Sequence, residues 1–404
     1  MRMIIDATLG SVGSYAMTPK QLLSDLYTAY YDARRHKRNK PYQQRFEANL
    51  ESNLEQLCDE LYLRTYKPLP SECFIITDPK KREVFAAHFR DRIVHHLYFN
   101  YTHELFERSF IQDSYSCIKG RGTHYGIGRL QSHILKESRN YTRPCFVLKM
   151  DIRGYFMSID RKRLLAICLE TLHKMANHRV NKFHMFCWKD YVDMDFVEYL
   201  SQEIIMLDPT KGCRMVGNSS DWNDLPHDKS LFHSPEGCGL PIGNLTSQLF
   251  SNVYLNEFDQ FMKRSLHCRH YGRYVDDFYV VSCDRQWLES LVQKVSGFLS
   301  DRLELTVHDG KTKIRSANDG IEFLGAFVLP YRTYLSRATF GRMDEKLYIL
   351  EAEADPVHNV NALNSYCGVL SHWNNFNVRQ KMLLKRHQFT DYGMFDYDVL
   401  HFYD

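Results

Sequence analysis

The stretch RYVDDFYVV, from Arg273 to Val281, places two adjacent carboxylates, Asp276 and Asp277, in the middle of an apolar run. The flanking aromatic and β-branched residues are typical of a buried strand, in which Asp is disfavoured. One interpretation is a two-residue hairpin turn with the Asp pair at its tip. The usual hairpin turns contain Gly or Asn, and neither is present. Because a buried carboxylate without a partner is costly, the pair indicates a bound divalent cation with oxygen ligands.

The composition is that of a globular protein. The 404 residues are enough for two or three subdomains, and 44% are hydrophobic and 25% charged. The net charge is only +3, so the overall charge does not indicate nucleic-acid binding. Local clusters of basic residues have to show whether the protein binds a nucleic acid. The 26 Tyr and 25 Phe either fill the core or form stacking platforms for bases.

Cysteine usage and hydropathy bear on the compartment. The 11 cysteines include no C-x-x-C pair, which argues against a zinc site and favours free thiols in a reducing cytoplasm. The first 17 residues have too short an apolar run for a signal peptide, and no apolar segment reaches about 18 residues. We therefore expect a cytoplasmic protein that does not cross a membrane.

Hydrophobic periodicity predicts an α+β fold, because strands and helices alternate without regular βαβ spacing. A basic run at 33–41 is either a solvated helix end or a phosphate contact. The predicted elements, in order, are a helical region over 18–65, strand–turn–strand over 73–90, a helix over 91–110, a basic Gly-containing loop over 114–127, a strand from 145 that ends at Asp151, an irregular insertion over 178–236, a Gly/Pro turn and helix over 239–262, the hairpin of 273–281, a helix over 285–303, a strand over 321–329, and a mostly helical tail from 337.

Asp151 is the third carboxylate of interest, because it ends an apolar strand. If folding brings it to Asp276 and Asp277, the three could hold two divalent ions about 4 Å apart, an arrangement that stabilises both oxygens of a phosphoryl displacement. Mg²⁺ is usually bound by one or two carboxylates together with substrate phosphates. The pattern therefore predicts a nucleotidyl-transfer site.

Five ordered blocks resemble the palm motifs of reverse transcriptases: FVLKMDIRGYFMSID, LPIGNLTSQLFSNVYLNEFD, RYVDDFYVV, HDGKTKI and IEFLGAFV. Upstream, KKREVFAAHFRDRIVHH and SYSCIKGRGTHYGI resemble the fingers motifs of the same family. The resemblance covers roughly residues 45–330. It implies a right-hand polymerase fold with an N-terminal helical extension at 1–44, fingers at 45–145, a palm of antiparallel sheet and helices at 146–330, with the insertion at about 178–236, and a helical thumb at 331–404.

One block narrows the resemblance. Where most reverse transcriptases have Gln-Gly and Ser-Pro, this chain has IGNLTSQ, from Ile242 to Gln248. That block is similar to the reverse transcriptases of diversity-generating retroelements, as are AYYDARRHKRNK and LNSYCGVLSHWNNFNVRQKMLL near the two ends. The implied function is synthesis of cDNA from a retroelement template RNA, error-prone at template adenines, for mutagenic retrohoming into a variable gene. The alternative is a group II intron-like or defence-associated reverse transcriptase, of the retron or abortive-infection type.

The resemblance implies that Asp151, Asp276 and Asp277 are the catalytic metal ligands, assisted by the backbone carbonyl of Ile152. The metals would be two Mg²⁺ ions, with Mn²⁺ as the alternative. The hairpin tip would then point at a metal rather than at solvent.

The resemblance also implies residues that contact the nucleotide. Phe156 would lie beneath the sugar and exclude a 2′-hydroxyl, unless it is a core Phe. Arg82 would pair with the triphosphate, although the KKR run at 80–82 offers three candidates. Lys311 would protonate the leaving pyrophosphate as a general acid, with Lys313 as the competing candidate; either could instead anchor a phosphate.

The remaining candidates lie near the template or the nascent pair. Asn244 and Gln248 would bond the nucleotide or template, or else cap a helix. Ile242 occupies a position where most of the family has a Gln, whose amide can hydrogen-bond beside the nascent pair, and Ile cannot form that bond. Lys119 and Arg121 would contact the template backbone. The tail carries basic and aromatic residues that form either a thumb helix along a duplex or a solvated face: Arg379, Lys381, Lys385 and Arg386, with Trp373 and Phe376.

The implied partners are a structured template RNA, the RNA/cDNA duplex and deoxynucleoside triphosphates, without a membrane. A small basic helical accessory protein is also expected, because a net charge of +3 is little for gripping a long RNA. The host would be bacterial or archaeal, or a phage. Two rival hypotheses are an RNA chaperone or maturase with a vestigial site, and a polymerase that extends without a template.

Overall fold

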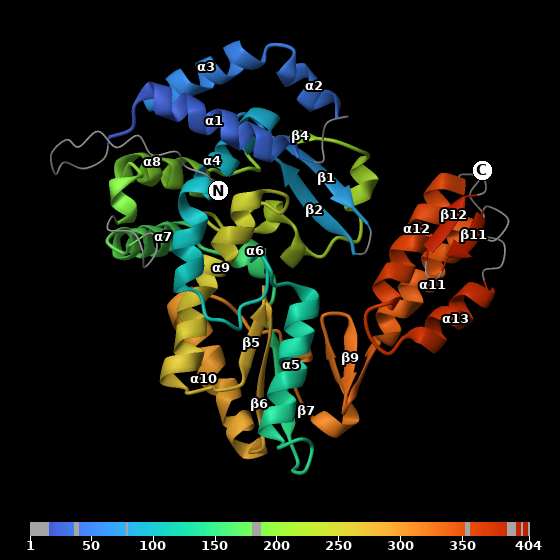
Figure 1. Ribbon diagram of the computed structural model, residues 1–404. Helices are drawn as coiled ribbons and strands as arrows, with labels where there is room; N and C mark the ends of the chain where they lie inside the picture. Colours follow the sequence, from blue (N-terminus) through green and yellow to red (C-terminus); the bar gives the residue numbers. More distant parts are fainter. Residues whose placement is uncertain are drawn as a thin grey trace. The chain divides into compact units, whose positions relative to one another are not determined.

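The computed structural model (Figure 1) describes residues 16–35, 40–77, 80–179, 187–351, 356–385, 393–396 and 399–402. The chain forms two compact units, and each combines segments that are distant in sequence. Unit 1 consists of Met1–Ile111, Arg153–Phe261 and Phe298–Thr306, and unit 2 consists of Gln112–Ile152, Met262–Gly297 and Val307–Asp404.

The two units are interleaved along the chain. The boundaries given above for the N-terminal extension, fingers, palm and thumb remain a prediction. Two features of the prediction lie outside the described residues. They are positions 36–39 of the basic run and Arg386 of the tail.

Unit 1 consists mostly of helices. The first three lie within residues 18–65, which confirms the helical region predicted there. Its first helix begins at a proline, and the hydroxyl of Thr18 accepts a hydrogen bond from the Gln21 amide at 3.3 Å, a regular N-cap. Helix α4 is central and packs against α1, α7 and α9. The helices are α1 (Pro19–Arg34), α2 (Pro41–Glu47), α3 (Leu50–Tyr62), α4 (Phe89–Ser109), α6 (Tyr155–Ser158), α7 (Arg161–Ala176), α8 (Met194–Ile205) and α9 (Leu245–Gln260).

Unit 1 also holds a small sheet of order β2–β1–β4. Strands β1 (Glu72–Ile76) and β2 (Arg82–Ala86) form the predicted antiparallel pair, and β4 (Arg214–Met215) is parallel to β1.

The prediction of an irregular segment over 178–236 is wrong in part, because it contains the regular helix α8. The Asp193 carboxylate caps α8 by accepting a hydrogen bond from the Phe196 amide at 3.0 Å. Phe196, Val197 and Leu200 are buried, and α8 packs against α4 and α7. The segment is therefore part of the core of unit 1.

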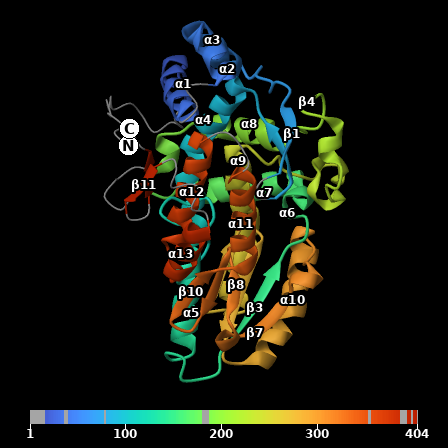
Figure 2. The same cartoon turned by 90° about the vertical axis from the view of Figure 1, so that its right-hand side faces the viewer.

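The central element of unit 2 is a four-stranded antiparallel sheet of order β5–β6–β3–β7. Its strands are β3 (Phe146–Asp151), β5 (Tyr271–Tyr274), β6 (Asp277–Ser282) and β7 (Lys313–Ser316). Helix α5 (Thr123–Glu137) lies along one face of this sheet, as Figures 1 and 2 show. The prediction that an apolar strand ends at Asp151 is confirmed.

The core of unit 2 lies between this sheet and α5. Val147 and Val281 of the sheet are buried with Ile127, Leu130 and Ile134 of α5. Full burial of such a side chain contributes about 1.5–3 kcal/mol, so this contact holds the sheet and the helix together.

The prediction of one strand over 321–329 is wrong, because the segment is a tight hairpin of β8 (Ile321–Phe323) and β9 (Ala326–Leu329). The two turn residues, Leu324 and Gly325, both have positive φ, at 50° and 82°. Positive φ at both positions is the type I′ geometry that joins neighbouring strands. Strand β10 (Arg332–Leu335) completes the sheet of order β10–β9–β8.

The remaining elements are mostly helical, as predicted for the tail. Helix α10 (Arg285–Leu303) has the predicted bounds, and the tail contains α11 (Arg337–Glu351), α12 (Pro356–Leu370), α13 (Phe376–Lys385) and a hairpin of β11 (Gly393–Asp396) and β12 (Val399–Phe402). Among the described residues, no helix is both long and apolar enough to cross a bilayer.

Candidate active site

Strand pairing brings the three predicted carboxylates to one end of the sheet in unit 2. Asp151, the last residue of β3, is the register partner of Asp277, the first residue of β6. The Ile152 amide donates a hydrogen bond to the Asp276 carbonyl at 3.2 Å, so the chain after β3 is tied to the turn before β6. Residues far apart in the sequence therefore meet at one edge.

The turn that carries Asp276 differs from the expected hairpin tip. Tyr274 is the register partner of Asp277, so the two turn residues are Val275 and Asp276, and Asp277 belongs to the strand. Val275 has φ at 55°, which is a genuine outlier for a β-branched residue. Such strain persists only where the surroundings impose it, and it is concentrated at functional sites.

Burial has the largest effect on the electrostatics of the site, and the neighbouring carboxylates add to it. Burial and the nearby Asp151 carboxylate raise the pKa of Asp276 from 3.8 to about 6. Burial also raises the pKa of Asp277, although the Lys149 ammonium 3.3 Å from its Oδ2 opposes that shift. Lys311 forms the second ion pair, with its Nζ 2.8 Å from Asp151 Oδ1.

The residues present fit a divalent metal site. Three carboxylates supply the hard oxygen ligands that Mg²⁺ prefers. Asp277 Oδ1 is buried and makes no hydrogen bond within the described residues, so it is available to a cation. By themselves, no three or more His, Cys, Asp or Glu side chains of those residues lie close enough together to hold a metal ion. An incomplete set of protein ligands is expected for a Mg²⁺ site in which substrate phosphates supply the remaining ligands.

Two candidate nucleotide contacts, Phe156 and Ile242, lie together in unit 1. Both are half-buried and pack against a cluster of Cys73, Phe85, Met157 and Leu231. The Leu240 amide donates to the Phe156 carbonyl at 2.8 Å, and the Phe85 amide donates to the Ile242 carbonyl at 2.9 Å. Backbone pairing therefore fixes both positions.

The other candidates in unit 1 differ in exposure. Asn244 is buried, and its amide oxygen accepts a hydrogen bond from the Ala87 amide at 3.3 Å. Its side chain makes no bond to α9, so the alternative that it caps this helix through its side chain is wrong. Gln248 is exposed on α9, and Arg82 is exposed at the start of β2. The neighbouring Lys81 bonds a loop carbonyl instead, which leaves Arg82 as the freer cation.

The template candidates in unit 2 also separate by burial. Lys119 is exposed, whereas Arg121 is half-buried and donates to the Ser114 carbonyl at 2.9 Å. Lys385 is exposed at the end of α13. Arg379 is only 8% exposed, with its guanidinium 5.7 Å from the centre of the Phe376 ring. Arg379 therefore packs within unit 2, and its contact with a duplex stays a prediction.

Lys149 was not among the residues predicted from the sequence, although its ion pair with Asp277 makes it part of the site. A signal was present in LKMD, because Lys149 precedes Asp151 by two residues. Side chains two apart on a strand share a face, so an ammonium beside the carboxylates was foreseeable. Lys313, the register partner of Lys149 on β7, is exposed.

Comparisons with known proteins found one curated relative and several similar solved structures. The bacterial protein YkfC of Escherichia coli (strain K12) is 25% identical over 333 residues, which are 74% of this chain and 75% of YkfC. A telomerase from Candida albicans, solved with a fragment of telomeric RNA, has a TM-score of 0.48 at 13% identity over 82% of this chain. The apo telomerase of Candida tropicalis has a TM-score of 0.45 at 10% identity over 82% of this chain. The matches span 58% and 60% of those telomerase chains.

The family model "Reverse transcriptase (RNA-dependent DNA polymerase)" matches residues 79–328, which is more than half of the chain. The matched region includes β3, the Val275–Asp276 turn and β6, the elements that carry the three carboxylates. The mixed α/β architecture is accordingly that of a reverse-transcriptase-like polymerase, and the chain belongs to the reverse transcriptase family.

Proposed function

We propose that this protein is an RNA-directed DNA polymerase that makes cDNA from the template RNA of a diversity-generating retroelement. The observation that carries the polymerase assignment is the meeting of Asp151 and Asp277 as register partners, with Asp276 in the adjoining turn. Family membership supports the same activity. The retroelement part rests on the IGNLTSQ block and on the resemblance of the flanking segments.

The catalytic roles follow from the chemistry of the residues at the sheet edge. Asp151, Asp276, Asp277 and the Ile152 carbonyl would hold two divalent ions. Bound ions would stabilise the attacking and leaving oxygens of an in-line phosphoryl displacement. Lys311, which is half-exposed and lies 2.8 Å from Asp151 Oδ1, would act as the general acid towards the leaving pyrophosphate.

Further residues are proposed to contact the substrate. Arg82 would bind the triphosphate through charge-assisted hydrogen bonds. Phe156 would exclude a 2′-hydroxyl, and Asn244 and Gln248 would contact the nucleotide or template. The exposed cations that would contact nucleic-acid phosphates are Lys119 and Lys385, with Arg121 beside Lys119.

The decisive experiment removes the ligands from β6 and its turn. The Asp276→Ala, Asp277→Ala double variant should lower Mg²⁺-dependent nucleotide incorporation by orders of magnitude. The matched control is Asp319→Ala, which removes an exposed carboxylate from the same unit and should leave incorporation unchanged. Near-normal incorporation by a folded double variant would refute the assignment. Primer extension with and without an RNA template separates this function from untemplated synthesis and from a vestigial site.

The proposed mutagenic role is tested separately, by the error rate opposite template adenine after a substitution at Ile242. Replacing it with Gln restores a side chain that can hydrogen-bond beside the nascent pair, and one hydrogen bond is worth about 0.5–1.5 kcal/mol. Ile242→Gln should therefore reduce misincorporation opposite template adenine by up to about tenfold. An unchanged error rate in an active enzyme would exclude Ile242 as the source.

The proposed accessory protein has its own test. Yield and template choice on the cognate RNA are compared with and without the proposed accessory protein. The low net charge of +3 leads us to expect a marked gain with the partner. Full yield and template choice from the enzyme alone would contradict a partner.

A further inference from the structure

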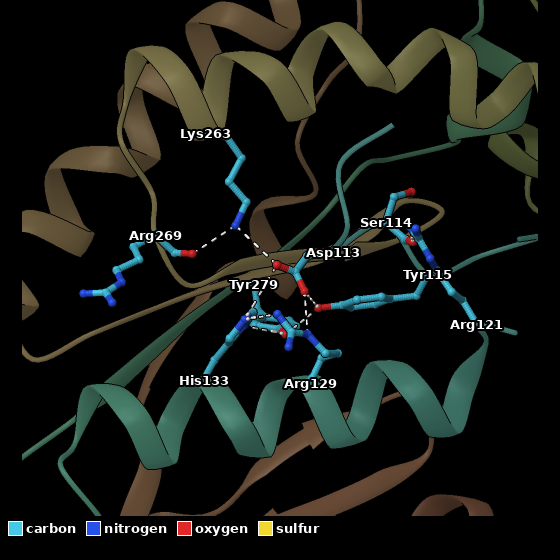
Figure 3. A network of polar contacts seen from close by, with 9 residues as sticks. All are labelled: Asp113, Ser114, Tyr115, Arg121, Arg129, His133, Lys263, Arg269 and Tyr279. Atoms are coloured by element: carbon cyan, nitrogen blue, oxygen red, sulfur yellow. Dashed lines mark hydrogen bonds and ion pairs between the residues drawn. The ribbon is translucent and has the colours of Figure 1, made fainter. Parts of the chain in front are cut away.

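A closed ring of hydrogen bonds lies in the core of unit 2 beside the catalytic strand (Figure 3). Arg129 Nε donates to Asp113 Oδ1 at 2.7 Å, and its Nη2 lies 3.1 Å from His133 Nε2. His133 Nδ1 lies 3.1 Å from the Tyr279 hydroxyl, which lies 2.8 Å from the Tyr115 hydroxyl. Tyr115 closes the circuit by donating to Asp113 Oδ1 at 3.2 Å. We call these five residues the Asp113 ring.

The direction of every bond in the Asp113 ring can be assigned. A carboxylate only accepts, so the one proton of Tyr115 goes to Asp113, and Tyr115 must accept from Tyr279. Tyr279 then accepts from His133 Nδ1–H. Arg129 only donates, so His133 Nε2 accepts, which requires the same neutral tautomer. The bonds traced from Asp113 and those traced from Arg129 both require His133 to carry its proton on Nδ1. The ring is therefore consistent with a single set of donors and acceptors.

The charges around the Asp113 ring support this arrangement. Burial of Asp113 is offset by Arg129 and by Lys263, whose Nζ lies 3.5 Å from Asp113 Oδ2 and donates to the Arg269 carbonyl at 3.0 Å. Although burial alone would raise it, the pKa of Asp113 lies below its ordinary value because of these partners. Burial and nearby cations lower the pKa of His133 to about 3, so its ring is neutral.

The segment that carries Asp113 and Tyr115 also supports the strained turn. The Arg273 amide donates to the Asp113 carbonyl at 2.9 Å, and the Tyr115 amide donates to the Arg273 carbonyl at 3.0 Å. Further along, the Val275 amide donates to the Ser116 hydroxyl at 3.3 Å, and Arg273 Nη1 donates to the Val275 carbonyl at 2.9 Å. Residues 113–116 thus form a shelf beneath the turn that contains Asp276.

The position of Tyr279 connects the Asp113 ring to the catalytic carboxylates. Tyr279 follows Asp277 by two residues on β6, so both side chains are on one face, about 7 Å apart along the strand. Lys149, the ion-pair partner of Asp277, is the register partner of Tyr279. Gly272 leaves room for the tyrosine pair, because a Cβ there would overlap the Tyr115 hydroxyl and lie 2.7 Å from that of Tyr279.

We propose that the Asp113 ring and its shelf are a positioning device that sets the place of Asp276 and Asp277, and so governs the turnover of the polymerase. This inference rests on the proposed function. None of its members is among the residues assigned to the metal or the substrate, and they act through β6 and the turn. It joins residues 113–116, α5 and the β5–β6 hairpin, so a loosened ring lets the carboxylates drift from the geometry that Mg²⁺ demands.

The test removes single hydroxyls from the ring of the full-length protein. In Tyr279→Phe and Tyr115→Phe, we expect the maximal single-turnover incorporation rate to fall about 10- to 100-fold, the size of loss that a displacement of about 1 Å can cause. The nucleotide concentration for half-maximal rate should change less than about threefold, because the nucleotide contacts are elsewhere. The double variant should be no slower than the slower single variant, because either change opens the same ring.

Two further measurements separate positioning from general loss of stability. The matched control is Tyr125→Phe, since Tyr125 packs edge-on against Tyr115 and its hydroxyl makes no hydrogen bond among the described residues. It should keep the wild-type rate. Calorimetric titration of Mg²⁺ into the free, folded proteins should show weaker binding in the ring variants only. Wild-type rate and Mg²⁺ affinity in folded Tyr279→Phe would overturn the proposal.

The outcomes also distinguish this inference from the proposed function. Wild-type protein that incorporates no nucleotide on any RNA template would refute the function, and the Mg²⁺ titration would still decide whether the ring positions the carboxylates. Wild-type activity that is lost in the Asp276→Ala, Asp277→Ala variant but retained in the ring variants would refute the ring alone.

Discussion

The burial of Asp276 beside other carboxylates leads to a prediction about the free energy of unfolding, which can be measured without an activity assay. Replacing Asp276 with Asn removes one negative charge and keeps the shape of the side chain, and Asn is well tolerated in turns. We expect this change to abolish incorporation and yet to stabilise the metal-free protein at neutral and higher pH. The residue would thus be retained for its chemistry at a cost to the free energy of unfolding.

The magnitude follows from the raised pKa of Asp276. The folded-state value of about 6 is above the ordinary value of 3.8, so protonation favours the folded state. The stability that this carboxyl contributes is fully present below pH 3.8 and is lost as the pH rises through about 6. At about 1.36 kcal/mol per pH unit, the loss at pH 8 is about 3 kcal/mol. Asp276 is partly exposed, and screening by water therefore reduces the expected gain in the Asn variant to about 1–3 kcal/mol.

The assay is urea denaturation of wild type and Asp276→Asn in the presence of EDTA at several pH values from 4 to 8. The variant should be more stable at pH 8, and the difference should shrink towards zero at pH 4. Asp319→Asn, at an exposed carboxylate, should match wild type throughout. Adding Mg²⁺ should stabilise wild type more than the variant, because binding to the folded state adds to its stability. Equal stability of the two proteins at pH 8, or a difference that persists unchanged at pH 4, would refute the reasoning.

Three other predictions concern neighbouring parts of the molecule. Lys149→Met leaves Asp277 without its counter-ion and should cost about 1–3 kcal/mol in urea denaturation at pH 8, whereas Lys313→Met, at the exposed register partner, should stay within about 0.5 kcal/mol; equal losses would contradict the ion pair. Phe156→Ala should raise ribonucleotide incorporation in primer extension while deoxynucleotide use is largely kept, and unchanged discrimination would return Phe156 to a packing role. Gly272→Ala should lower stability by about 1–3 kcal/mol, because the added methyl meets two buried tyrosine hydroxyls; an unchanged melting temperature would contradict that contact.

Local patterns in the sequence were sufficient for several elements. The apolar run that ends at Asp151 predicted β3, and the periodicity over 285–303 predicted α10 with the observed bounds. These predictions succeeded because strand and helix periodicity depends on residues a few positions apart. The order of the five blocks was likewise enough to place the chain among reverse transcriptases, which the family match supports.

Local patterns failed where a distant segment decides the outcome. The 178–236 segment was predicted to be irregular, but α8 is stabilised by packing on α4 and α7, which the segment alone does not reveal. Tertiary contacts override weak local preferences there. The 321–329 segment was mispredicted for a different reason. An apolar run is compatible with one strand or two, and the two-residue turn with positive φ at Leu324 and Gly325 makes it a hairpin.

By itself, the sequence predicted which residues would carry the chemistry: Asp151 at the end of a strand, and Asp276 with Asp277 in an apolar run. Only the tertiary structure decided how they meet. The register of β3 against β6 places Asp151 opposite Asp277, and it brings Lys149 to Asp277 across 128 positions of sequence. The packing of α5 and of the segment that carries Asp113 and Tyr115 against β6 closes the Asp113 ring. The physical reason is that a carboxylate's partners and pKa depend on distances in space, which pairing between remote strands sets and local spacing does not.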